Sequence, residues 1–320
     1  MNLFLWIGAG VGLFLMGMKS TGEHLTALLG ARLEKWIGRA TRTPLGGILS
    51  GAAFTALIQS SDATNCLVIE LLDGGRLTLE RAAAVMMGAN IGTTMTGQLV
   101  ALELTDWGPL LLLPGACLRI AGGKQNALRH VGGAMAGLGM LFLGMELVET
   151  GCAPLSGVEW VRGLFCGLES PGWALILSAV LTAGLQSSSA FVGLMQTFAS
   201  AGVLPLTAAP SLVMGSAIGT CATELLISAG ARDEGRRAAL FHLLVNCFGA
   251  AAVLTLGYAV PVDEWIRGLS GGQPSRYLAN LNTGLKSLEI LLLAPVMEPL
   301  VRLTRRILPE RGIKSQEERV

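Results

Sequence analysis

The sequence predicts an all-α polytopic membrane protein, built as an inverted structural repeat with two re-entrant helical hairpins and about seven transmembrane helices. Of its 320 residues, 52% are hydrophobic and 14% are charged, against about 25% charged in soluble domains. A polar tetrad, Gln59-Ser60-Ser61-Asp62, returns 127 residues later as Gln186-Ser187-Ser188-Ser189 in equally apolar surroundings. Finally, the basic residues are distributed so that equivalent loops of the two copies fall on opposite sides of a membrane.

The repeat extends beyond the tetrads at the same offset. It aligns Gly17-Met18 with Gly144-Met145, and Ile91-Gly92-Thr93 with Ile218-Gly219-Thr220, without a gap. Internal duplication of this kind is typical of secondary transporters. We therefore assign residues 1–126 to a first repeat, residues 127–302 to a second repeat with additional helices, and residues 303–320 to a basic cytoplasmic tail.

The first repeat begins with Leu3 to Met18, which lacks the basic start and cleavage site of a signal peptide and is expected to remain as a helix. Lys19 to Arg42 carries five basic and two acidic residues, which predicts a cytoplasmic position. The apolar residues of this stretch recur at helical spacing, which predicts an interfacial helix. A re-entrant hairpin over residues 45–72 follows, because each arm is too short to cross about 30 Å of hydrocarbon. Spans near Ala82–Leu104 and ending near Leu118 complete this half.

The second repeat shows the opposite charge pattern. Its loop from Glu146 to Pro171 has one basic and four acidic residues, which predicts an external position. The second hairpin, residues 173–198, then enters from outside. We expect a cell-membrane protein with its N-terminus outside and its C-terminus in the cytoplasm. The predicted spans of this half are Ala127–Leu147, Leu204–Ala229, Ala238–Val260 and Tyr277–Val301.

The tetrads are the candidate substrate site. A single such motif in a membrane helix is usually structural, with hydroxyls that bond backbone or neighbouring helices, but duplication in one register favours function. At a hairpin tip, the second arm directs unpaired N–H groups of a helix N-terminus into the membrane, and such ends attract anions. The predicted substrate-binding residues are Gln59, Ser60, Ser61, Gln186, Ser187, Ser188 and Ser189.

A second duplicated element, Gly88 to Thr94 and Gly215 to Cys221, follows each hairpin. Its two glycines, four residues apart, are consistent with close helix packing. The polar residues among them favour a broken helix whose exposed carbonyl groups complete a sodium site. The predicted sodium ligands are Asp62, Asn90, Thr93, Thr94, Ser216 and Thr220, and no other cofactor is expected.

These motifs resemble the type II sodium/phosphate cotransporter family. The resemblance covers nearly the whole chain and rests on TALIQSS, MGANIGTT, TAGLQSSSA, GSAIGT and RRAALFHLLVN. It implies sodium-coupled transport of inorganic phosphate, with both held at the paired tetrads. Candidate partners are a second copy of the chain, in a homodimer, and a separate PhoU-like regulator.

The chain departs from the family pattern at three places. Asp62 stands where the family has serine, and a carboxylate there would repel an anion and attract a cation. Ala217 replaces the asparagine that Asn90 supplies in the first half. The sequence ends at Val320 without a PhoU-like domain. The first departure bears on substrate identity, the second on sodium stoichiometry and the third on regulation.

Other classes of function fit less well. A net charge of +1 argues against a nucleic-acid partner, and the sequence has no G-x-S-x-G element of a serine hydrolase, so no enzymatic activity is expected. A sodium-coupled carrier of another anion and a non-transporting phosphate sensor or scaffold stay open. Cys152 and Cys166 share the predicted outer loop and could form a disulfide. His242 shares a helix face with Asn246, where a structural role between helices is favoured over a role in substrate binding.

Overall fold

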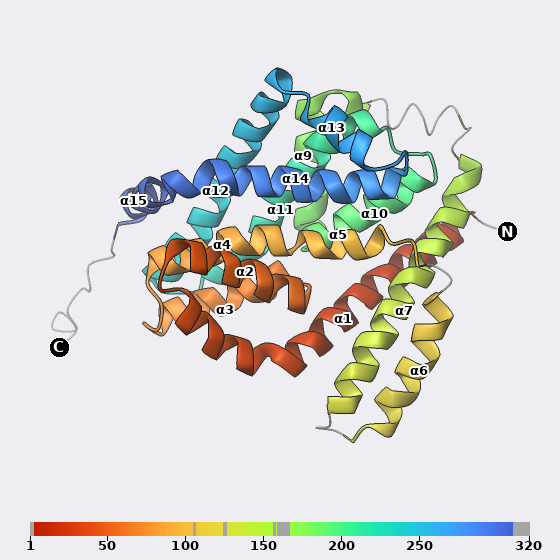
Figure 1. The fold of residues 1–320 in the computed structure, drawn as a ribbon, viewed down its shortest axis with the longest axis horizontal. Coiled ribbons are helices and arrows are strands. Elements are labelled where there is room, and N and C mark those ends of the chain that lie inside the picture. The colour runs from red at the N-terminus through yellow and green to blue at the C-terminus, as the bar shows by residue number, and fades with distance from the viewer. Residues whose placement is uncertain (1–2, 105–106, 124–126, 156–157, 159–166, 310–320) are drawn as a thin grey trace, which may run out of the picture.

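The computed structural model describes residues 3–104, 107–123, 127–155, 158 and 167–309, and within them every regular element is a helix. Figure 1 shows helices of both halves packed into one body, with α14 lying along α4 and α5. The first half contains α1 (Leu3–Ala40), α2 (Pro44–Ile58), α3 (Ser61–Asp73), α4 (Leu79–Gly92), α5 (Thr94–Val100) and α6 (Trp107–Ala121).

The second half repeats this order and then adds helices. It contains α7 (Ala127–Cys152), α9 (Pro171–Leu185), α10 (Ser188–Ser200), α11 (Ala209–Ser228), α12 (Asp233–Ala259), α13 (Val262–Leu269), α14 (Pro274–Leu293) and α15 (Met297–Ile307). Short 3₁₀ turns lie at Ala153–Leu155, Gly167–Glu169, Leu206–Ala208 and Ala294–Val296. The predicted all-helical fold class is confirmed. Cys152 is buried and forms no disulfide with the described cysteines, whereas Cys166 lies outside the described residues, so their disulfide stays a prediction.

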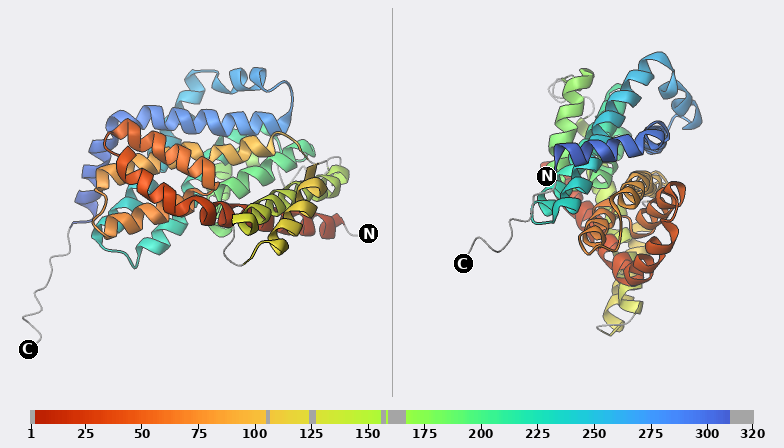
Figure 2. Two further views of the ribbon diagram at one scale, coloured as in Figure 1. Left: turned by 60° about the horizontal axis from the view of Figure 1, so that its bottom comes forward. Right: turned by 90° about the vertical axis from the view of Figure 1, so that its left-hand side faces the viewer.

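The equivalent helices α1 and α7 run antiparallel, as an inverted repeat requires. A Cβ added to Gly10 would lie 2.8 Å from the carbonyl oxygen of Gly144, and a Cβ on Gly17 would lie 2.6 Å from that of Gly137. Going along α1 from Gly10 to Gly17, the contacted residue of α7 moves back from Gly144 to Gly137, so the helices run in opposite directions. The repeat offset of 127 residues equates Gly10 with Gly137 and Gly17 with Gly144, so it converts each contact into the other. These glycines allow the backbones to touch. Figure 2 shows α7 with its neighbour α6 at one end of the molecule.

Each hairpin consists of two short helices separated by the first two residues of its tetrad. The chain turns at Gln59 and Gln186, which both adopt a left-handed conformation, with φ of 59° and 54°. The second pair, Pro171–Leu185 and Ser188–Ser200, is bent by 120°. The two predicted hairpins are thus present, with their breaks at the tetrads.

The paired glycines of the second element are packing positions. A Cβ on Gly88 would lie 1.9 Å from the carbonyl oxygen of Ile48, and a Cβ on Gly219 would lie 2.3 Å from that of Ala179. Both glycines therefore press their helix against the first arm of the preceding hairpin. The broken-helix prediction is wrong for the second copy, because α11 is continuous, and in the first copy only Thr93 interrupts the helix while keeping right-handed helical angles.

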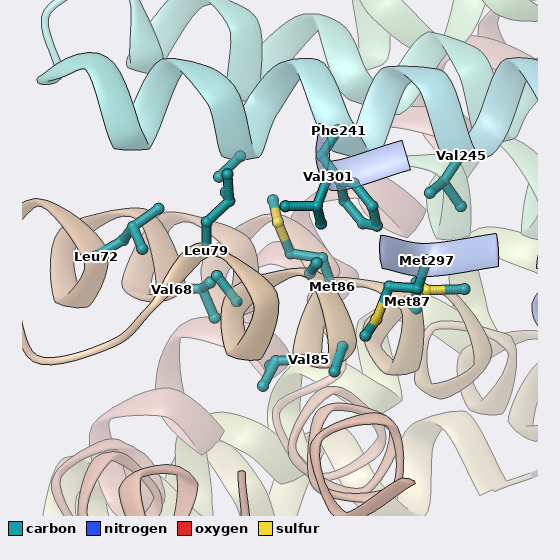
Figure 3. Packing of buried hydrophobic residues seen from close by; sticks show 14 of the residues in the cluster. Val68, Leu72, Leu79, Val85, Met86, Met87, Phe241, Val245, Met297 and Val301 are labelled. Carbon is teal, nitrogen blue, oxygen red and sulfur yellow. The ribbon is translucent and has the colours of Figure 1, made fainter. Parts of the chain in front are cut away.

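A buried apolar cluster joins the first hairpin to the C-terminal helices. Figure 3 shows α4 side chains such as Met86 and Met87 packed beside Phe241 of α12 and Met297 of α15. Phe241, Met86 and Met87 are fully buried. A fully buried side chain of this size contributes about 1.5–3 kcal/mol of hydrophobic stabilisation, so this cluster fixes the hairpin against α12.

Four of the seven predicted spans are long and apolar enough on their own to cross a membrane: Leu3–Leu29, Ala127–Leu155, Leu206–Ser228 and Asp233–Gly257. The other three are short or interrupted. Ala82–Leu104 is divided at Thr93, α6 has 15 residues, and Tyr277–Val301 is divided by a 3₁₀ turn. The first span and the interfacial helix predicted after Met18 are one helix, since α1 runs without a break to Ala40, and the interfacial position of its second part stays a prediction.

Candidate functional site

A cavity of about 750 Å³ lies where the two hairpin tips meet. Gln59, Ser60 and Asp62 line it from the first tetrad, and Gln186 and Ser187 line it from the second. The structure therefore brings together polar side chains from both repeats. Helix α1 closes one side with Lys19 and Glu23, two lining residues that the tetrad argument did not identify.

The tip serines cap the second arms and keep a hydrogen to donate. Ser60 Oγ accepts the backbone N–H of Ala63, and Ser187 Oγ accepts that of Ala190, each at 3.2 Å. A serine hydroxyl that accepts in this way still carries its own O–H donor. Each hairpin thus presents a hydroxyl donor and the N-terminus of a helix to the cavity, a combination suited to an anion.

Two matching contacts between the halves follow the common offset of the two repeats. Thr93 Oγ1 lies 2.9 Å from Ser189 Oγ, and Thr220 Oγ1 donates to Asp62 Oδ1 at 3.2 Å. Thr93 and Thr220 are equivalent under the offset of 127 residues, as are Asp62 and Ser189. Each threonine therefore reaches the fourth residue of the opposite tetrad, and Asp62 replaces a hydroxyl by a carboxylate at one of the two contacts.

The remaining predicted ligands lie behind the tips. Ser61 and Ser188 are each 6% exposed, and Thr93 Oγ1 donates to Ser61 Oγ at 3.5 Å. Thr94 and Ser216 donate to backbone carbonyl groups of their own helices, those of Ile91 and Val213, at 2.8 Å. A donating hydroxyl retains its lone pairs, so the sodium assignments of these residues stay predictions.

Gln59 and Asn90 are held by other side chains. Gln59 Oε1 accepts Thr96 Oγ1 at 2.8 Å. Asn90 is 2% exposed, and its Oδ1 lies 2.8 Å from His242 Nε2. The amide oxygen of Asn90 thus accepts from an imidazole and retains a second lone pair, so its sodium assignment stays a prediction, and Asn90 also belongs to a buried polar network.

This buried network joins α3, α4, α11, α12 and α14. Glu224 accepts Asn65 Nδ2 at 2.6 Å through Oε1, and its Oε2 lies 2.5 Å from His242 Nδ1. Lys286 Nζ donates to Asn246 Oδ1 at 3.0 Å and lies 3.5 Å from Glu289 Oε2. The side chains of all three charged members are at most 3% exposed. Buried charges of this kind persist only when they are paired.

Hydrogen-bond donors and acceptors fix the protons of the network. Lys286 can only donate, so Asn246 presents its oxygen, and Asn90 Nδ2 donates to the same oxygen at 3.2 Å. Asn90 Oδ1 therefore accepts from His242 Nε2, and one further proton must lie between Nδ1 and Glu224. The His242–Glu224 pair shares that proton, and Lys286 lies beside Glu289 as a second pair. Asp62 lies outside both pairs.

Ionisable residues inside the predicted spans were a sequence signal for this network, which neither the composition nor the repeat revealed. Glu224 lies inside the predicted span Leu204–Ala229, and Lys286 and Glu289 lie inside Tyr277–Val301. Ionisable residues within a span are functional or paired by default. The expectation that His242 and Asn246 serve between helices agrees with their contacts, because His242 contacts Asn90 of α4 and Asn246 accepts from Lys286 of α14.

Comparison with known proteins gives a match to one family in both halves. The sequence model of the family described as Na+/Pi-cotransporter matches residues 13–150 and again residues 143–271. The chain is 27% identical over 297 residues to the uncharacterized protein YqeW of Bacillus subtilis (strain 168), covering 92% of this chain and 95% of YqeW.

Two further relatives carry names related to phosphate. The putative inorganic phosphate export protein YjbB of Escherichia coli (strain K12) is 28% identical over 258 residues, which is 79% of this chain and 47% of YjbB, so this chain spans about half the length of that relative. The sodium-dependent phosphate transport protein 2B of Homo sapiens is 41% identical over 59 residues, or 18% of this chain and 9% of that protein. No solved structure matches.

Proposed function

This chain belongs to the Na+/Pi-cotransporter family, a family of membrane transporters, and from that premise we propose that it carries inorganic phosphate together with sodium across the cell membrane by alternating access. Phosphate and sodium are held at the paired hairpin tips. The observation that supports this proposal most is the shared cavity, lined by both tetrads.

Phosphate binding is supported by the donors at the tips. Ser60 and Ser187 each offer a hydroxyl hydrogen beside the N-terminus of a helix, and Lys19 adds an ammonium group on the cavity wall. Hydrogen bonds to a charged partner contribute about 1.5–3 kcal/mol each. A tetrahedral anion between the two tips can use donors from both repeats at once.

Sodium coupling is supported by the charge of the same cavity. Among its lining residues, Lys19 is basic, whereas Glu23 and Asp62 are acidic. A phosphate anion entering a lining with excess negative charge is stabilised by a cation that enters with it. Glu23 of this cavity lies beside Lys19, and Glu224 and Glu289 of the buried network lie beside His242 and Lys286. Asp62, which accepts from Thr220, has no cationic partner of this kind among the described residues and is the carboxylate that we assign to the cation.

Alternating access is supported by the antiparallel repeats. At the tips the halves meet through the contacts of Thr93 with Ser189 and of Thr220 with Asp62, and inverted repeats that share a site can rock against each other around it. We keep the orientation predicted from loop charge, with the C-terminus in the cytoplasm. A homodimer and a PhoU-like regulator also remain predictions of the resemblance.

Counterflow in proteoliposomes tests the transport proposal without assuming a direction, which matters because YjbB is named for export. Vesicles loaded with unlabelled phosphate should accumulate labelled phosphate when sodium is present on both sides, and should do so several-fold less when potassium replaces sodium. Equal counterflow in potassium would remove sodium from the proposal. No counterflow in either salt would favour the sensor or scaffold, and preference for a different anion would favour a carrier of that anion.

Replacing Asp62 tests its contact with sodium. Asp62→Asn keeps an oxygen for Thr220 but removes the charge, so the sodium concentration for half-maximal counterflow should rise about tenfold, which corresponds to about 1.4 kcal/mol, with a smaller change in the phosphate affinity. Glu23→Gln is the matched control, because it removes an exposed carboxylate from the same cavity. An unchanged sodium dependence in Asp62→Asn would leave Asp62 as a structural residue in the first turn of α3 that accepts from Thr220.

A further inference from the structure

A groove of about 610 Å³ lies between α12 and the C-terminal helix α15, apart from the transport cavity. Phe248 and Ala252 line it from α12, one turn apart, and Val296 lies at one end. On α15, Leu303 lies beside two basic residues, Arg302 and Arg306. The groove is thus apolar along most of its length and cationic at one side.

Its position on α12 places the apolar part within the membrane. Phe248 and Ala252 belong to the candidate span Asp233–Gly257, and the side chain of Phe248 is 46% exposed. A large apolar side chain exposed on a membrane span contacts lipid. Figure 1 shows α15 at the same end of the molecule as α12, where α14 ends.

The cationic part lies toward the predicted cytoplasmic surface. Arg237 Nε, near the start of α12, donates to the carbonyl group of Leu308, just after the end of α15, at 2.8 Å. Helix α15 therefore extends from the apolar part of α12 toward its first turn, where Arg232 and Arg236 predict the cytoplasmic side. Arg302 and Arg306 lie between these two points.

Neither guanidinium group of the groove is strongly engaged within the described residues. Arg302 lies 3.7 Å from Glu298, and the two side chains are 68% and 74% exposed, so this ion pair is weak. No ion pair of Arg306 is found within residues 3–309 as far as they are described. Arg305, which points elsewhere, pairs with Glu80 at 2.8 Å.

We propose that this groove binds an anionic phospholipid of the surrounding bilayer. Its phosphodiester lies between Arg302 and Arg306, because guanidinium groups bind phosphate oxygens through paired charge-assisted hydrogen bonds. One acyl chain lies along Phe248, Ala252 and Val296. The polarity of the groove, apolar toward the membrane interior and cationic toward the predicted cytoplasmic surface, matches that of the lipid, and basic pockets between spans on this side are suited to anionic headgroups.

Lipid binding to the full chain in phosphatidylcholine nanodiscs tests this proposal. Phosphatidylglycerol should be retained in native mass spectra and bind more tightly than added phosphatidylcholine. The double variant Arg302→Gln/Arg306→Gln should weaken phosphatidylglycerol binding by about tenfold or more. The matched control is Arg119→Gln, which removes an exposed arginine from the end of α6 and should leave binding unchanged. Ala252→Trp should reduce binding without any change in charge, because it fills the apolar part.

Several results would overturn the proposal. Equal binding by the double variant and the unmodified protein would remove the arginines from the site, and an equal loss in Arg119→Gln would show only general attraction to a basic surface. Unchanged binding in Ala252→Trp would exclude the acyl chain from the groove. Displacement of the lipid by inorganic phosphate at millimolar concentration would assign the arginines to free phosphate instead.

Discussion

Replacing Lys286 by methionine is expected to destabilise the protein more than any other single change considered for this molecule. Lys286 is buried, neutralises Glu289 at 3.5 Å, and donates to Asn246. Both carboxylate oxygens of Glu289 are buried and have no hydrogen-bond partner in the described residues. Removing the ammonium group leaves an uncompensated charge, which costs about 3–5 kcal/mol. Thermal unfolding in detergent, followed by intrinsic fluorescence, measures the loss.

The companion variants identify the cause. Lys286→Met/Glu289→Leu removes both charges and should recover most of the stability, because apolar replacements for a buried pair are often neutral. Lys19→Met is the matched control, since Lys19 forms an exposed pair with Glu23 at 3.9 Å and should cost at most about 1 kcal/mol. If the double variant were as unstable as Lys286→Met, the stabilisation would come from the bond to Asn246 and not from charge pairing.

Removing either tip hydroxyl is expected to weaken phosphate binding about tenfold or more. Ser60 and Ser187 both line the cavity and both retain a hydrogen after capping their helices, and a hydrogen bond to an anion contributes about 1.5–3 kcal/mol. Ser60→Ala and Ser187→Ala also remove a helix cap, worth about 1 kcal/mol of stability. Thr43→Ala is the matched control, because Thr43 caps α2 by accepting Gly46 N–H but does not line the cavity.

Much of the site could be predicted because equivalent residues of the two repeats can be compared with each other. The register that equates Asp62 with Ser189 also equates Thr93 with Thr220, and these four residues make a matching pair of contacts between each tetrad and the opposite half. The breaks at Gln59 and Gln186 followed from the same register. The sequence could not show that Thr94 and Ser216 bond to their own backbone, because that depends on side-chain rotamers.

The broken helices and the polar network show the limits of local reasoning. Glycines four residues apart are typical both of a broken helix and of close packing between two helices. Gly88 packs against the backbone of Ile48, which is 40 positions away in the sequence. The sequence could not show that Asn90 contacts His242, because the two residues are 152 positions apart. Charged residues within predicted spans, such as Glu224 and Lys286, were the local signal that such partners exist.

The most direct test of the account is equilibrium binding of labelled phosphate to the purified protein in sodium, measured for the unmodified chain, Ser60→Ala, Ser187→Ala and Thr43→Ala. A site shared by both hairpin tips predicts that the two serine variants each lose about tenfold or more in affinity and that Thr43→Ala binds as the unmodified chain does. Normal affinity in either serine variant would contradict the account, because phosphate would then contact one tip and not both.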